Sequence, residues 1–253
     1  MPIHERYSVI GTPLLASSYE SLRGDLLDSR RRREPRTVDF SNTQIVTARR
    51  HDPEFRAVTQ VFDTFVPDGM PLIWCMNAQG AGLKDRVYGP TFTRHFLVQS
   101  PPDVTHFFLG GSEECLHLLV ARMRAENPSL NVVGQQHGYF KSEDEGAIVK
   151  GIQAAHPDVL WVGLGTPKQQ QWISRHRSAL RTMIICAVGF AFDVNAGTKK
   201  DAPLTIQKLG LTWLFRMLSE PRRLFTRYLR FNSLFLYYLG REVFSRSLQA
   251  RRS

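Results

Sequence analysis

Residues 64–89, TFVPDGMPLIWCMNAQGAGLKDRVYG, place a Pro-Asp-Gly turn between two apolar runs. The carboxylate of Asp68 therefore lies at a turn between two segments that we expect to be buried. Arg86 and Gly89 follow a short distance later in the chain. An acid in this position either caps the helix that follows or serves as a catalytic base, and the local pattern alone favours the cap.

The composition is ordinary for a folded protein. The 253 residues, 42% hydrophobic and 22% charged, are enough for one large domain or for a domain with an appendage. Three scattered cysteines in apolar segments predict buried thiols in a reducing compartment. The first residues lack the apolar core of a signal peptide, and no uncharged run approaches the roughly 20 residues that span a bilayer. We therefore expect a cytoplasmic protein without a membrane-spanning segment.

The net charge of +10 is concentrated near the end of the chain. Residues 196–253 hold 12 Lys and Arg against 3 Asp and Glu, whereas the other 195 residues hold 21 against 20. A nearly neutral body with a cationic tail implies a polyanionic partner, such as nucleic acid, anionic lipid or a phosphorylated substrate.

Short apolar segments alternate with glycine turns and amphipathic segments over most of the chain. Segments 37–40, 130–133, 159–164 and 183–188 are typical of buried strands, and amphipathic helices are expected between them, one of them from Pro53 to about Asp63. Residues 7–10 are a further strand candidate, which a turn at residues 11–13 would end. The alternation predicts an α/β fold, with a Rossmann-like, largely parallel sheet flanked by helices.

Ligands of such sheets bind beyond the carboxyl ends of the strands. Five features follow expected strands, and we expect them to gather on one rim: Asn42, Asp68, Gly110, the loop around His137, and Gln169. For Asn42 an N-cap is the favoured local interpretation. Gly110 is a weak phosphate signal, because acidic residues begin the next helix and the G-x-G-x-x-G spacing is absent. His137 has no second ligand at metal spacing.

The pattern changes after Pro203, where apolar and aromatic residues mix with arginines. At about 100° per residue, Arg223, Arg227 and Arg230 share one face of an expected helix. Such a helix lies on a membrane surface or packs on its own domain, and the two interpretations are equally supported. We expect residues 1–195 to form the α/β domain and residues 196–253 to form a basic, helical, membrane-binding appendage.

Four stretches together resemble the WecG/TagA/CpsF glycosyltransferases, glycosyltransferase family 26. They are PDGMPLIW with DRVYG, FFLGGSEE with NPSLNVVGQQHGYF, VGLGTPKQQQW, and GFAFDVNAGTKKDAPLTIQKLGLTWLFRMLSEPRRLFTRYL. Their order and spacing match the family pattern from about Ser41 to Leu229, which is most of the chain, and the last two stretches are specific.

The resemblance implies an inverting, metal-independent transferase without a cofactor, at the inner face of the cytoplasmic membrane. Such enzymes move a sugar from a UDP-sugar onto a polyprenyl-diphosphate-linked sugar in the synthesis of bacterial cell-surface polysaccharides. The donor would carry N-acetylmannosamine, its uronic acid or a related hexose. The implied partners are the donor, the lipid-linked acceptor and the anionic membrane surface, and the resemblance leaves oligomerisation open.

The resemblance also assigns roles to single residues. Asp68 matches the family's proposed catalytic base. The matching substrate-binding positions are Asn42, Arg86, Gln169, Arg216 and Arg223, with Arg227 or Arg230 behind them. Within the same motifs, further candidate substrate contacts are Ser41, Gly110, Gly165 and Lys168.

Three residues depart from the family pattern. Phe40 stands where Thr is common, which implies a different donor sugar or a pocket whose polar contact comes from Ser41. Asp201 replaces a usual Arg, and Thr212 replaces a usual acid. Both lie in the expected appendage, where they would alter contacts with the acceptor.

The chemistry of an inverting transfer fits these residues. One base must deprotonate the acceptor hydroxyl, opposite the leaving UDP. The chain has no D-x-D pair to hold a metal on the diphosphate, so arginines and backbone amides would stabilise the leaving charge. The alternative is a nucleic-acid-binding protein that uses the Arg/aromatic tail, but the Phe and Leu among its arginines suit lipid better. The missing G-x-G-x-x-G spacing disfavours a third class, a nicotinamide-dependent enzyme.

Overall fold

A computed structural model describes residues 5–180 and 183–250, without the side chains of Arg223 and of residues 246–250. Within these residues, eight strands form one sheet in the order β1-β2-β4-β3-β8-β7-β5-β6. The strands are β1 Arg6–Val9, β2 Thr12–Leu15, β3 Arg36–Ser41, β4 Thr64–Pro67, β5 Thr105–Gly110, β6 Asn131–Gln136, β7 Val159–Gly163 and β8 Ile184–Ala187. All neighbouring strands run parallel except the β1–β2 hairpin. The predicted α/β fold with a largely parallel sheet is confirmed.

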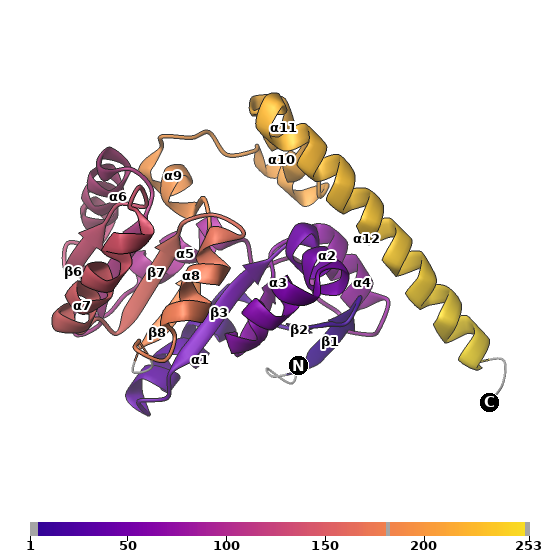
Figure 1. The fold of residues 1–253 in the computed structure, drawn as a ribbon, viewed down its shortest axis with the longest axis horizontal. Helices are drawn as coiled ribbons and strands as arrows, with labels where there is room; N and C mark the ends of the chain where they lie inside the picture. Colours follow the sequence, from indigo (N-terminus) through magenta and orange to yellow (C-terminus); the bar gives the residue numbers. More distant parts are fainter. Residues whose placement is uncertain (1–4, 181–182, 251–253) are drawn as a thin grey trace.

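Helices cover both faces of this sheet (Figure 1). The helices of the first face are α1 Tyr19–Arg31, α5 Gly89–Val98, α6 Glu113–Glu126 and α9 Ala191–Ala196. Those of the second face are α2 Thr43–His51, α4 Met70–Asn77, α7 Glu145–Ala155 and α8 Lys168–His176. The shorter segments are α3 Pro53–Val58 and the 3₁₀ turns η1 Thr59–Val61 and η2 Ser142–Asp144.

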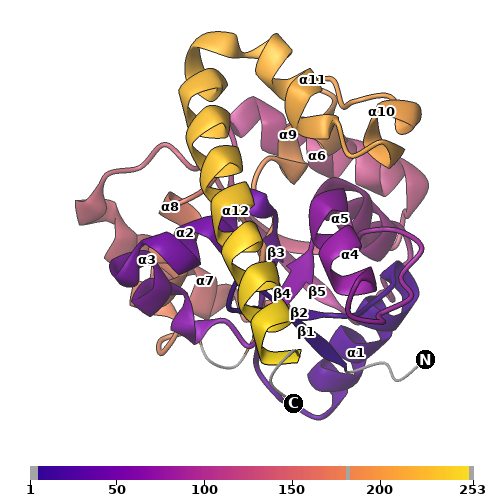
Figure 2. The ribbon, with the colours of Figure 1, turned by 90° about the vertical axis from the view of Figure 1, so that its right-hand side faces the viewer.

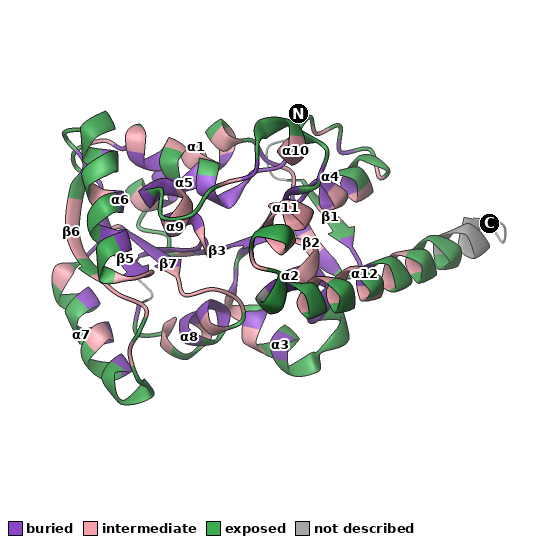
Figure 3. Ribbon diagram, turned by 90° about the horizontal axis from the view of Figure 1, so that it is seen from above, coloured by how far each residue is buried: buried purple, intermediate pink, exposed green. Residues whose placement is uncertain are grey.

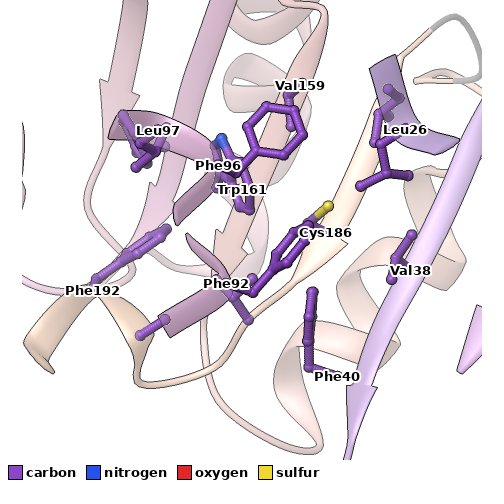
Figure 4. Close-up of a cluster of buried hydrophobic side chains, with 14 of the residues drawn as sticks. Leu26, Val38, Phe40, Phe92, Phe96, Leu97, Val159, Trp161, Cys186 and Phe192 are labelled. Atoms are coloured by element: carbon purple, nitrogen blue, oxygen red, sulfur yellow. The ribbon is translucent and has the colours of Figure 1, made fainter. Parts of the chain in front are cut away.

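The core of the first face explains one departure from the family pattern. Figure 4 shows Phe40 of β3 pointing into this core, and its ring centroid lies 5.0 Å from that of Phe92 in α5. The Phe40 side chain is 4% exposed. Burying an aromatic side chain of this size stabilises the fold by about 1.5–3 kcal/mol. Phe40 is therefore a core residue whose edge also reaches the carboxyl rim of the sheet.

Three local expectations are corrected by the structure. The predicted turn at residues 11–13 is instead the start of β2, because the hairpin turns at Ile10 and Gly11, whose φ angles are 42° and 84°. The expected helix 53–63 stops at Val58 and continues as a 3₁₀ turn, where the Arg49 guanidinium donates to the Thr59 carbonyl at 3.2 Å. The strand expected at residues 130–133 extends to Gln136 and shortens the loop around His137.

The C-terminal part of the chain forms α10 Leu204–Lys208, α11 Thr212–Ser219 and α12 Pro221–Ala250. Figure 2 shows α12 running across the molecule, where it packs on α2. His51 Nδ1 and the Tyr238 hydroxyl form a hydrogen bond of 2.8 Å in this contact. Figure 3 shows exposed residues along most of α12. None of the helices in residues 5–180 and 183–250 is long and apolar enough to cross a membrane.

Strand register brings the carboxyl ends of the central strands to one edge. Ser41 of β3 pairs with Pro67 of β4, and Gly110 of β5 pairs with Gly163 of β7. The residues that follow these strands therefore lie close together, as expected for the rim of a parallel sheet.

Candidate active site

A pocket of about 510 Å³ opens at this carboxyl edge. Five strand ends contribute residues to its wall: Asn42, Asp68, Gly111, Leu164 and Gly189. The loop and first turn of α8 add Gly165, Lys168 and Gln169, and the C-terminal helices add Arg216 and Arg227. The pocket thus combines the rim of the sheet with two arginines from the basic end of the chain.

Asp68 does not cap the helix that follows it. The N-cap of α4 is Gly69, and no side chain hydrogen-bonds to the first turn of this helix. Instead, the Gly89 N–H donates to Asp68 Oδ1 at 3.2 Å. The cap that the local sequence pattern favours is therefore wrong, and the carboxylate is left available at the pocket wall.

The environment of Asp68 shifts its acidity strongly. Burial raises the pKa of the carboxyl to about 7, and the nearby Asp39 carboxyl adds to the rise. Arg86, the Gly89 N–H and Arg216 act in the opposite direction by favouring the charged form. The residue nevertheless lines the pocket and keeps part of its surface exposed. It is therefore a carboxyl with a pKa suited to proton transfer at neutral pH, within reach of a ligand.

Arg86 stands behind Asp68 and does not line the pocket. It is buried, and its guanidinium donates to the Asp68 carbonyl at 3.2 Å, to Gln207 Oε1 at 3.2 Å and to Thr212 Oγ1 at 3.0 Å. Its charge also lies over the Tyr88 ring, 4.2 Å from the ring centroid. Arg86 therefore ties the Asp68 turn to α10 and α11.

Tyr88 and Asp201 make a second connection between the same parts. The Tyr88 hydroxyl donates to Asp201 Oδ1 at 2.7 Å, and Gln207 Nε2 donates to Asp201 Oδ2 at 3.1 Å. Asp201 and Thr212, two of the departures from the family pattern, thus accept hydrogen bonds that hold the C-terminal helices over the rim. No local pattern in the sequence predicts these contacts.

Gln169 joins two glycine loops at the centre of the pocket. Its Oε1 accepts from the Gly165 N–H at 3.2 Å and from the Gly189 N–H at 3.1 Å. The side chain is 2% exposed and lines the pocket. Gln169 therefore fixes the two glycine loops at the pocket wall.

Lys168 and Tyr139 lie at another side of the same pocket. Lys168 Nζ donates to the Gly138 carbonyl at 2.9 Å and lies 4.5 Å from the centroid of the Phe140 ring. Tyr139 is 79% exposed, so its ring presents a flat aromatic face to solvent at the pocket edge.

Asn42 caps α2, as the local sequence pattern predicts. Its Oδ1 accepts from the Ile45 N–H at 3.2 Å, while the residue also lines the pocket. Ser41 is fully buried behind it and donates to Asp39 Oδ1 at 2.5 Å. Gln170 Nε2 donates to the other oxygen of Asp39 at 2.7 Å. Burial raises the pKa of Asp39 to about 6, and Ser41 supports this buried carboxyl instead of lining the pocket.

Gly110 shapes the rim without lining the pocket. It has a φ of 135°, and a Cβ at this position would lie 2.4 Å from the backbone of Gly163. A side chain cannot be accommodated where β5 and β7 approach so closely. The neighbouring Gly111 lines the pocket in its place.

The C-terminal arginines reach the site from α11 and α12. The guanidinium of Arg216 lies 3.6 Å from the centroid of the Phe190 ring, and Arg227 lines the same pocket. Arg223 lies one turn before Arg227 on α12, and its side chain is outside the described part of the chain. Arg230 lies over the Phe231 ring at 5.7 Å and does not line the pocket.

Residues 5–180 and 183–250 contain no group of three or more His, Cys, Asp or Glu side chains placed to hold a metal. His137 accepts a hydrogen bond from the Tyr139 N–H at 3.2 Å within its own loop.

Comparison with known proteins shows that the chain is a glycosyltransferase. Residues 7–249 match the glycosyl transferase WecG/TagA/CpsF family, and the chain belongs to this family. A more particular similarity is to a protein of Bacillus spizizenii, N-acetylglucosaminyldiphosphoundecaprenol N-acetyl-beta-D-mannosaminyltransferase. The two are 27% identical over 184 residues, which cover 72% of this chain and 71% of the relative.

Proposed function

We propose that this glycosyltransferase moves a sugar from a UDP-sugar onto a polyprenyl-diphosphate-linked sugar, with inversion and without a metal ion. The observation that carries the proposal is the enclosed carboxyl of Asp68, whose pKa burial raises to about 7 beside a pocket that contains arginines. The name of the Bacillus spizizenii relative supports the acceptor class, because it specifies a sugar on diphosphoundecaprenol.

In this proposal Asp68 is the general base. Its ionised carboxylate accepts the proton of the acceptor hydroxyl as that oxygen attacks the anomeric carbon, and the bond to UDP breaks on the opposite side. The Gly89 N–H donates to Oδ1 at 3.2 Å, and in this proposal Oδ2 faces the hydroxyl. Arg86 orients the turn through the Asp68 carbonyl.

The donor would bind along the glycine-rich strand ends. Asn42, Gly165, Lys168 and Gln169 line this part of the pocket and offer amide, backbone and ammonium donors. The exposed ring of Tyr139 provides a surface on which the uracil base can stack. Ser41 and Gly110 support the wall from behind.

Two diphosphates must be held during the transfer, and the arginines of the C-terminal helices are placed to hold them. Arg216 and Arg227 line the pocket from the appendage, and Arg223 precedes Arg227 by four residues on α12. Guanidinium groups bind phosphate oxygens through two hydrogen bonds at once, which suits a leaving UDP that lacks a metal ion.

Exposed apolar side chains support the membrane role that we propose for the appendage. Leu218, Phe225, Leu229 and Phe244 are 71%, 52%, 59% and 66% exposed, respectively. Basic residues near an anionic surface add about 1 kcal/mol each to binding. We propose that residues 196–253 hold the protein at the inner face of the cytoplasmic membrane, and that residues 1–195 form the catalytic domain.

Vesicle sedimentation tests this attachment. The double variant Leu229→Glu/Phe244→Glu should no longer sediment with anionic vesicles at physiological salt. The control Leu118→Glu, at an exposed position on α6, should still sediment with them. Unchanged sedimentation of the double variant would remove the membrane role of this face. A chain that ends at Ala196 and still unfolds cooperatively would support the division at this residue.

Transfer itself is tested with N-acetylglucosaminyl diphosphoundecaprenol and a panel of UDP-sugars that contains N-acetylmannosamine, its uronic acid and related hexoses. We expect one donor to give a disaccharide lipid with inverted anomeric configuration, at a rate that EDTA does not change. Salt-dependent retention on nucleic acid without any UDP-sugar binding would contradict the proposal and favour the alternative function.

A further inference from the structure

A second cavity, of about 670 Å³, runs between α4 and α12. We call it the α4–α12 groove. One wall is the side of α4 that carries Pro71, Trp74 and Ala78, and the facing wall is the side of α12 that carries Phe235, Leu236 and Leu239. Val9 of β1 lies at its base.

The lining follows helical spacing on both walls. On α12 the stripe runs from Asn232 to Val243, a length of roughly 16 Å at 1.5 Å per residue. On α4 and its C-terminal end the stripe runs from Pro71 to Gln79. The groove is thus a long channel with two helical sides, suited to an extended ligand.

The groove is open and mostly apolar, and the charged residue Glu242 of α12 also lines it. Trp74, Leu236 and Val243 are 53%, 67% and 60% exposed, so large apolar side chains meet solvent along it. Gln79 uses its amide inside the protein, since Nε2 donates to the Ser8 and Cys75 carbonyls at 3.0 Å each. Exposed apolar surface that is gathered in a channel marks a site for an apolar partner.

Residues of the groove and residues of the active-site pocket lie close together in the chain at three places. In each pair below, the first residue lines the pocket, the second lines the groove, and the two are at most three residues apart in the chain: Asn42 and Thr43, Asp68 and Pro71, Arg216 and Trp213. Neighbouring Cα atoms are about 3.8 Å apart, so the linings of the two cavities approach each other at the starts of α2 and α4.

The far side of the groove is continuous with the apolar face of the appendage. Leu236 and Val243 line the groove, and they are as exposed as Leu229 and Phe244 on the same helix. A hydrocarbon chain that leaves the membrane along α12 therefore has an apolar path from the bilayer to the pocket.

We propose that the α4–α12 groove binds the polyprenyl chain of the lipid-linked acceptor. This inference rests on the proposed function, which places the acceptor sugar at Asp68 and its diphosphate at the arginines. An acceptor held there has to extend its hydrocarbon chain away from the charged pocket, and the groove is the apolar channel that begins beside Asp68 and Arg216. Shielding both the chain and the walls of the groove from water contributes to affinity.

Ala78→Trp tests the proposal, because Ala78 is exposed and its side chain borders the groove, so that an indole would fill the channel. Two acceptors with the same N-acetylglucosaminyl diphosphate head are compared: the undecaprenyl ester in phosphatidylcholine–phosphatidylglycerol vesicles, and the methyl ester in solution. Leu118→Trp, at an exposed site on α6, is the matched control.

We expect Ala78→Trp to lower kcat/KM for the undecaprenyl acceptor by about tenfold, which corresponds to the loss of about 1.4 kcal/mol of binding. The kcat/KM of Ala78→Trp for the methyl ester should stay within about twofold of that of the native protein. The same holds for the kcat/KM of Leu118→Trp with either acceptor. An equal loss of kcat/KM with both acceptors, or no loss with either, would contradict the assignment of the groove to the polyprenyl chain. Absence of transfer from every donor by the native protein would instead refute the proposed function, and the groove assignment with it.

A binding measurement without turnover uses Cys75, which lines the groove and is half-buried, whereas Cys115 and Cys186 are buried. A maleimide probe should label Cys75 at least fivefold more slowly in vesicles that contain the undecaprenyl acceptor than in vesicles without it, with Cys75→Ser as the background control. Equal protection by vesicles without acceptor would assign the groove to bilayer lipid, and protection that depends only on protein concentration would assign it to a second copy of the chain. Either result contradicts the proposal.

Discussion

Replacing Arg86 by Met removes a cation from behind the proposed base and keeps most of the side-chain volume. In the native protein, burial raises the pKa of Asp68 to about 7, and Arg86 is the strongest of the groups that oppose this rise. Without that charge the Asp68 carboxyl holds its proton to higher pH. The acid limb of the kcat/KM profile should therefore move upward.

The size of the effect can be worked out. Loss of a nearby opposite charge raises a carboxyl pKa by about one unit or more, so we expect an acid limb near pH 8 instead of one near pH 7. At pH 7 the ionised fraction falls from about one half to about one tenth, which predicts a roughly fivefold loss of kcat/KM. At about pH 9.5 the carboxylate is ionised in both proteins, and this part of the loss disappears.

Arg86→Lys separates charge from hydrogen bonding. Lys keeps the cation but cannot donate together to the Asp68 carbonyl, Gln207 and Thr212, as the guanidinium does. The Arg86→Lys variant should keep the acid limb of the kcat/KM profile near pH 7. Its weaker hydrogen bonding should speed hydrogen exchange in α10 and α11. The assay is kcat/KM from about pH 5.5 to about pH 9.5 for both variants and the native protein. An acid limb that stays at one pH in all three proteins would refute the reasoning.

Three further outcomes follow from the same contacts. Asp68→Asn should raise the free energy of unfolding in urea at pH 8. The gain should vanish below about pH 4. The Asp68 carboxyl has a pKa of 3.8 in the unfolded chain and about 7 in the folded protein, so its ionisation destabilises the fold only above about pH 4. Gly110→Ala should lower the free energy of unfolding by about 3 kcal/mol, whereas Gly151→Ala, in open space on α7, should raise it by about 0.5–1 kcal/mol. Asp201→Ala removes the acceptor of the Tyr88 hydroxyl and should speed hydrogen exchange in α10 and α11 without changing exchange in the sheet.

The rim of the sheet could be predicted from the sequence because the patterns that mark strand ends lie within a few consecutive residues. Apolar runs that end in glycine or a polar residue identify the carboxyl ends of strands, and parallel pairing then brings Asn42, Asp68 and Gln169 together. Whether an acid at such an end is a cap depends on geometry. At α4 the chain turns through Gly69, which takes the N-cap position and leaves the Asp68 carboxylate to Gly89.

The contacts that connect distant parts of the chain could not be predicted. Arg86 and Thr212 are 126 residues apart, and no local pattern announces their hydrogen bond. The hairpin β1–β2 could not be predicted because Ile10, at its turn, adopts a positive φ that usually requires glycine. The α4–α12 groove is formed by two helical stripes that lie far apart in the sequence. No local pattern predicts that these stripes face each other.

The role of Asp68 is tested most directly by the rate of sugar transfer in Asp68→Asn, measured under single-turnover conditions at pH 8 with saturating donor and acceptor. Asn keeps the shape of the turn but cannot accept the proton, so the account predicts a loss of at least about 100-fold, with donor binding unchanged. A rate within about threefold of the native protein would show that another group is the base and contradict the account.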